Sequence, residues 1–73
     1  MEAEKWGRRI RAYRKLKGFT QEGFSNELGI SVSIMGEIER GARMPSKEIL
    51  TKISNALKVS IEELAPPENG DIK

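Results

Sequence analysis

The side chains of this sequence whose type and spacing could do chemistry are its lysines and arginines, which gather in two blocks. Residues 1–19 carry seven bases and two acids, and residues 40–58 carry five bases and one acid. Residues 20–39, between them, carry four acids and no base, and residues 59–73 carry four acids and one base. If the two basic blocks meet in the fold, they form a positive surface that attracts phosphate. The alternative is that these charges only solvate a small helical protein.

The composition excludes several other kinds of chemistry. The 73 residues include no cysteine and no histidine, so we expect no disulfide, no metal site and no cofactor. The two side chains best suited to catalysis near neutral pH are absent, and the carboxylates and lysines form no constellation typical of an active site. No apolar run approaches the roughly 18 residues of a membrane span, and the acidic start lacks a signal-peptide core. We expect a cytoplasmic, soluble protein that is not an enzyme and binds no small molecule.

A chain of this length holds one hydrophobic core, and its apolar residues repeat at helical spacing. Residues 1–65 are predicted to form one domain and residues 66–73, which lack this spacing, a disordered tail. The pattern predicts an all-α fold of five helices over 4–17, 21–28, 32–40, 47–58 and 61–65.

Polar residues at the predicted helix starts support these boundaries. A side-chain hydroxyl before a helix accepts a hydrogen bond from a free backbone N–H, and Thr20, Ser31 and Ser46 stand at such positions. Ser60 and Glu63 have the spacing of a capping box. The first three helices are followed by glycines at positions 18, 29 and 41, which suit helix ends.

Two of the predicted helices have the pattern of a helix-turn-helix. Phe24 and Leu28 share one face of the helix over 21–28, and Met35 and Ile38 share one face of the helix over 32–40. Gly29 supplies the tight bend between them. In a helix-turn-helix, the second helix can enter the major groove of DNA.

Four strings, in order and at matching spacing, make the sequence resemble the Cro/phage-repressor (Xre-type) helix-turn-helix family. They occupy residues 14–22, 28–31, 38–46 and 57–64, and the resemblance covers about residues 6–65. It implies a compact five-helix, lambda-repressor-like domain. It also implies a DNA-binding regulator of transcription, most often a repressor that binds a palindromic operator as a homodimer.

The resemblance also implies roles for particular residues. Thr20 and Gln21 match the positions that clamp phosphate at the start of the second helix, where free N–H groups favour an anion. Arg43 matches a basic loop position that contacts the DNA backbone or the minor groove. Arg14 and Glu39 match an internal ion pair between the first and third helices.

The third helix carries the positions that match the base-facing residues of the family. These are Val32, Ser33, Gly36 and Glu37, and Arg40 falls on the same face. None of the four can make the bidentate contacts that Arg, Gln or Asn makes with guanine or adenine, so we expect moderate affinity with a steep salt dependence. The candidate DNA-binding set is Thr20, Gln21, Ser31, Val32, Ser33, Gly36, Glu37, Arg40 and Arg43.

Other features leave alternatives open. Arg8, Arg9 and Arg11 face either phosphate or solvent. A core this small is expected to leave Leu16, Ile61 and Leu64 partly exposed, and exposed apolar residues near the C-terminus suit a two-fold contact. The main alternative function is a protein-interaction module on the same scaffold, such as an antitoxin-like or anti-repressor partner.

Overall fold

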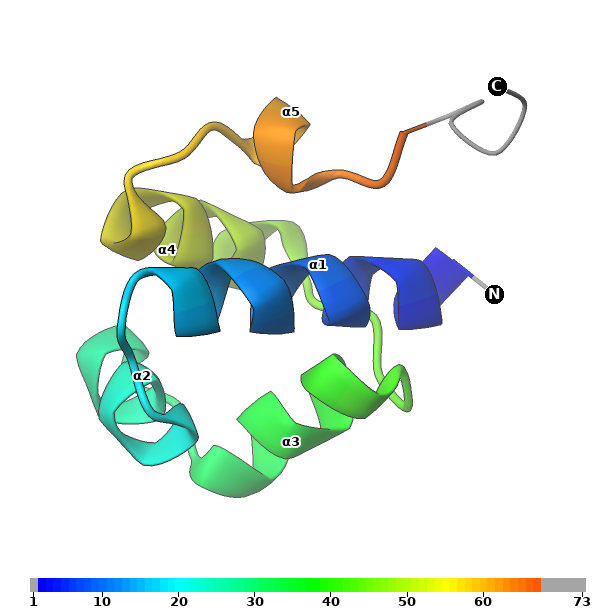
Figure 1. Cartoon of the computed structure of the whole chain (residues 1–73). Helices are drawn as coiled ribbons and strands as arrows, with labels where there is room; N and C mark the ends of the chain where they lie inside the picture. Colours follow the sequence, from blue (N-terminus) through cyan, green and yellow to red (C-terminus); the bar gives the residue numbers. More distant parts are fainter. Residues whose placement is uncertain (1, 68–73) are drawn as a thin grey trace.

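The computed structural model describes residues 2–67, and every regular element within that range is a helix (Figure 1). The helices are α1 (Glu2–Leu16), α2 (Gln21–Leu28), α3 (Val32–Arg40), α4 (Lys47–Leu57) and α5 (Ile61–Leu64). This confirms the predicted all-α class and the predicted bounds of α2 and α3. The predicted disordered tail lies outside the described residues from position 68 onward. None of the described helices is long and apolar enough to span a membrane.

The helices surround α1, which crosses the centre of the molecule (Figure 1). α3 packs on one side of α1, and α4 and α5 pack on the other. α2 closes one end, where it contacts both α3 and α4. The arrangement leaves the outer side of α3 away from the rest of the bundle.

Side-chain caps begin four of the helices, as predicted. Thr20, Ser31, Ser46 and Ser60 each accept a hydrogen bond from the backbone N–H three residues later. Glu63 completes the capping box by accepting from the Ser60 N–H at 3.2 Å. Such caps satisfy N–H groups that have no partner within the helix, and each stabilises its helix by about 1 kcal/mol.

Four helix bounds, in three helices, differ from the prediction. α1 begins two residues earlier and ends one residue earlier than expected. α4 ends at Leu57 because Lys58 adopts a left-handed conformation, with φ of 60°, and caps the helix in the way glycine usually does. α5 ends at Leu64 because the backbone of Ala65 is extended.

The core confirms the predicted helix-turn-helix contact. Its buried apolar side chains come from all five helices and include Phe24, Leu28, Met35 and Ile38. The expectation of a partly exposed Leu64 is wrong, because this side chain is fully buried in the core where α5 packs on α1 and α4. Leu16, in contrast, is 76% exposed.

Two glycines allow α3 to reach its position against α1 and α2. Gly29 makes the turn between α2 and α3 with a φ of 74°. This left-handed conformation costs glycine less free energy than it costs residues that have a Cβ. Gly7 is buried, and a Cβ at this position would collide with the carbonyl oxygens of Ile38 and Glu39. The absence of a side chain therefore lets α1 approach the C-terminal turn of α3.

Candidate nucleic-acid interface

The outward face of α3 holds the side chains predicted to face DNA bases. Val32 and Ser33 are exposed at its N-terminal end, and Glu37 is half-buried further along. Gly36 is buried because the side chain of Arg40 lies over it, with Nη1 3.2 Å from where a Cβ would be. The face is therefore mixed, with an apolar and a hydroxyl group at one end and charged groups towards the other.

An ion pair connects this face to the following loop. Arg43 Nε donates to Glu37 Oε1 at 2.7 Å, and the arginine and glutamate side chains are 51% and 37% exposed. The basic loop residue is therefore held against α3. Sequence reasoning treated Arg43 and Glu37 as separate positions, since nothing local in the sequence joins them.

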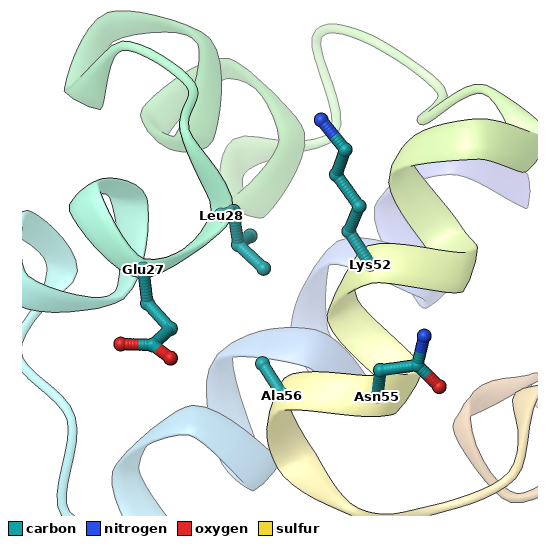
Figure 2. A pocket seen from close by; sticks show the side chains of 5 residues that line it. All are labelled: Glu27, Leu28, Lys52, Asn55 and Ala56. Carbon is teal, nitrogen blue, oxygen red and sulfur yellow. The ribbon is translucent and has the colours of Figure 1, made fainter.

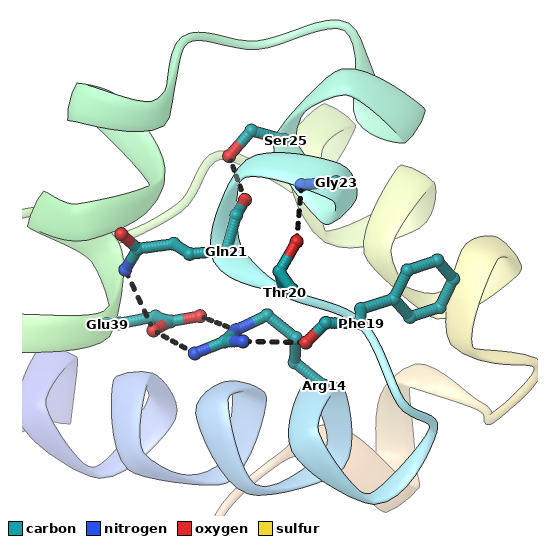
Figure 3. A network of polar contacts seen from close by, with 7 residues as sticks. All are labelled: Arg14, Phe19, Thr20, Gln21, Gly23, Ser25 and Glu39. Carbon is teal, nitrogen blue, oxygen red and sulfur yellow. Dashed lines mark hydrogen bonds and ion pairs between the residues drawn. The ribbon is translucent and has the colours of Figure 1, made fainter.

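The start of α2 holds the two residues predicted to clamp phosphate. Thr20 Oγ1 accepts from the Gly23 N–H at 2.9 Å, which leaves its own O–H free to donate. The Gln21 amide donates to Glu39 Oε1 at 3.1 Å (Figure 3). Ser31 caps α3 as Thr20 caps α2, by accepting from the Ile34 N–H.

A buried network lies behind Gln21, and it confirms the predicted ion pair. Arg14 Nε and Nη2 donate to the two carboxylate oxygens of Glu39 at 2.6 and 3.2 Å, and Nη1 donates to the Phe19 carbonyl at 2.8 Å (Figure 3). The two charged side chains are only 8% and 4% exposed. Arg14 therefore joins α1 to α3 and to the loop before α2, and its burial and its pairing with Glu39 give it a structural role.

A shallow hollow of about 500 Å³ opens beside this network, between α1, α2 and α3. It is lined by Arg11, Arg14, Gln21, Gly36, Glu39 and Arg40. Arg14 is neutralised by Glu39, whereas exposed Arg11 and Arg40 have no ion-pair partner among residues 2–67. The hollow is therefore positively charged. Arg11 was not in the candidate set of DNA-binding residues. Its spacing of four residues from Lys15 and three from Arg14 nevertheless indicates a basic face on α1.

Arg9 does not belong to this surface. Its Nε and Nη2 donate to the carbonyls of Leu64 and Glu63 at 3.0 and 2.7 Å, and its guanidinium lies 5.9 Å from the centre of the Tyr13 ring. The expectation that it faces phosphate or solvent is wrong. Because the last carbonyls of a helix lack partners within it, Arg9 holds α5 onto α1 instead.

A second hollow lies between α2 and α4, away from the face of α3. Figure 2 shows Glu27 and Lys52 on its two sides, with Leu28 and Ala56 between them. It contains one charge of each sign and does not extend the basic surface. Within residues 2–67 no three acidic side chains gather in a way that could hold a metal ion.

Comparisons with known proteins agree with this geometry. A profile of the helix-turn-helix family HTH_3 matches residues 10–64. The chain is 68% identical over 68 residues to the uncharacterized HTH-type transcriptional regulator YazB of Bacillus subtilis, covering 93% of this chain and 99% of YazB. It is 37% identical over 59 residues to the HTH-type transcriptional regulator SinR of Bacillus subtilis, covering 80% of this chain but only 53% of SinR.

Solved structures give the same result. The restriction-modification controller protein C.AhdI from Aeromonas hydrophila superposes with a TM-score of 0.81 at 35% identity, covering 85% of this chain and 94% of that one. SinR, the master regulator for biofilm formation, in complex with DNA superposes with a TM-score of 0.77 at 37% identity, covering 81% and 95%.

Proposed function

Because the chain belongs to the helix-turn-helix family of transcriptional regulators, we propose that it binds specific double-stranded DNA sites and represses transcription by occupying a promoter. Regulators of this family are not enzymes. The observation that carries the proposal is the exposed outer face of α3, bordered by arginines. We propose that the protein acts in the cytoplasm.

The proposed mode of binding places α3 in the major groove. Val32 offers a methyl contact to thymine, and Ser33 offers a hydroxyl to a base edge. Thr20, Gln21 and Ser31 lie at helix N-termini, where free N–H groups and the helix dipole favour phosphate.

Two arginines, one on α1 and one at the end of α3, supply the attraction to the DNA backbone. Arg11 and Arg40 line the positive hollow, and we assign both to phosphates. Arg40 is the one base within α2 and α3, so most of the binding energy that depends on salt comes from this residue and from bases outside the two helices, such as Arg11.

We further propose that the protein acts as a homodimer on a palindromic operator. One copy offers only a short recognition helix, and a second copy about 34–36 Å along the DNA doubles the contacts. The exposed Leu16 and the half-buried Ile61 are candidates for the contact between copies.

Selection of bound fragments from genomic DNA tests the proposal. We expect enrichment of sites with two-fold symmetry, and a gel-shift affinity that falls steeply between 50 and 200 mM salt, two concentrations chosen to span the response. Light scattering of the complex should give the mass of the DNA plus two protein chains. Enrichment of no site would contradict the DNA-binding function and favour a protein-interaction module that uses Val32 and the similarly exposed Met44.

A further inference from the structure

The ion pair between Glu37 and Arg43 leaves specific hydrogen-bonding groups unused. Arg43 is bound only through Nε, so both terminal nitrogens remain available. Glu37 uses only Oε1, so Oε2 remains available as an acceptor. Within residues 2–67 no other side chain or carbonyl pairs with these groups, and the two side chains are 51% and 37% exposed.

The unused groups are of the donor and acceptor types that one base pair requires. A guanidinium whose Nε is occupied presents its two terminal nitrogens as a planar pair of donors. In the major groove, guanine presents two acceptors, O6 and N7, and its cytosine partner presents one donor, the N4 amine. A carboxylate oxygen beside the arginine can accept from that amine.

We propose that Glu37 and Arg43 act as one unit that reads a single G·C base pair in each half-site. The terminal nitrogens of Arg43 donate to O6 and N7 of guanine, and Glu37 Oε2 accepts from N4 of cytosine. This inference rests on the proposed DNA-binding function and names its specificity-determining residues. It gives Arg43 a base-reading role, whereas the family resemblance implies a contact with the DNA backbone or the minor groove.

The pairing also explains how an acidic residue can face DNA. A lone carboxylate in the groove would be repelled by phosphates, but the charge of Glu37 is balanced by Arg43 at 2.7 Å. Holding Arg43 in place before binding reduces the side-chain entropy lost when the complex forms. Since α3 carries no Gln, Asn or Arg at Val32, Ser33 or Gly36, the loop supplies the bidentate donor that the helix lacks.

The experiment compares the sequence preference of wild-type protein with that of three variants. Each protein is used to select sites from a random double-stranded library. Affinities are then measured on the selected operator and on a copy in which the candidate G·C pair is replaced by A·T. Circular dichroism melts confirm that each variant is folded.

We expect wild-type protein to prefer the G·C operator by about tenfold or more, since one good bidentate contact discriminates by about 1–3 kcal/mol. Arg43→Ala and Arg43→Lys should bring the two affinities within about twofold, because lysine lacks the planar fork. Glu37→Gln should reduce the preference several-fold, since its amide NH₂ would face the cytosine amine.

Lys5→Ala is the matched control. Lys5 is exposed and lies about 160° around α1 from Gly7, which packs on α3. This variant loses one positive charge and should leave the ratio of the two affinities unchanged.

Two results would overturn this inference and leave the proposed function intact. One is a selected operator that contains no G·C pair whose recognition depends on Arg43. The other is an Arg43→Ala variant that weakens both operators equally and lowers the salt slope by about one, which is the signature of a phosphate contact. Failure of wild-type protein to select any DNA would overturn the proposed function as well.

Discussion

Two glutamates on α3, separated by one residue, each pair with an arginine, and the two pairs differ in almost every physical respect. Glu39 and Arg14 are more than nine-tenths buried, joined by two hydrogen bonds, and linked further to Phe19 and Gln21. Glu37 and Arg43 share one hydrogen bond and are about half exposed. Since successive residues turn by about 100°, the two glutamates lie on nearly opposite sides of α3.

The difference separates the structural role of α3 from its binding role. The charges of the buried pair have left water, so each depends on its partner for stability. The exposed pair remains hydrated, contributes little to folding and keeps unused hydrogen-bonding groups for DNA. One side of the helix is therefore held in the core while the other stays available.

The largest expected effect comes from breaking the buried pair. Glu39→Gln leaves the Arg14 charge unpaired, and we expect the free energy of unfolding to fall by about 3–5 kcal/mol. Urea unfolding followed by circular dichroism measures this loss. The double variant Arg14→Met/Glu39→Leu should recover part of it, because no buried charge is then left alone. A loss no greater than that of Glu37→Gln would contradict the comparison.

Arg9 provides an intermediate case, since it is partly buried and binds two carbonyls of α5. Arg9→Ala should lower the free energy of unfolding by about 1–2 kcal/mol, because hydrogen bonds from a charged donor are lost. Thermal and urea unfolding test this. Arg8→Ala, at an exposed neighbouring position, should change stability by less than about 0.5 kcal/mol. Equal losses of stability in the two variants would contradict a role for Arg9 in holding α5 onto α1.

Gly36 tests whether the outward face of α3 needs a glycine. A Cβ there would press on the end of the flexible Arg40 side chain and on no backbone atom, so Arg40 can move aside. Gly36→Ala should raise the free energy of unfolding by about 0.5–1 kcal/mol through better helix propensity. Gly7→Ala is the opposite control, because its Cβ would meet backbone carbonyls and should destabilise the protein. A lower free energy of unfolding for Gly36→Ala would show that the surroundings of Gly36 are packed too closely for a Cβ.

The smallest expected effect is the coupling within the exposed pair. A double-mutant cycle on Glu37 and Arg43 should give about 0.2–1 kcal/mol at low salt. In 1 M NaCl, where the Debye length is about 3 Å, this coupling should shrink towards zero. The same cycle on Arg14 and Glu39 should keep most of its value. Equal salt sensitivity would show that the two pairs share one environment.

Much of the fold could be predicted from the sequence because its signals are local. The four hydroxyl caps act on N–H groups three residues away, and the bend at Gly29 depends on that residue's own φ. The apolar spacing of Phe24, Leu28, Met35 and Ile38 indicated the contact between α2 and α3. The same helical period placed Val32, Ser33, Gly36 and Glu37 on one outward face, and the family resemblance supplied their base-facing role.

The partners of the arginines could not be predicted in this way, except for Arg14, where the family resemblance supplied the answer. An arginine side chain is long and flexible, and its choice of acceptor depends on groups distant in the chain. Arg9 bonds carbonyls more than fifty residues away, and no local pattern distinguishes it from Arg8. Arg43 reaches back across the end of α3 to Glu37.

The sequence by itself determined the class of fold, the capped starts of α2 to α5, the turn and the face of α3 that remains outside, since these depend on short-range periodicity and capping. Tertiary structure alone decided which charges are consumed in the core and which remain for a partner. It also decided that Gly7 lies where α1 and α3 approach too closely for a side chain. The physical reason is that burial and ion pairing depend on distances in space, which neighbours along the chain do not specify.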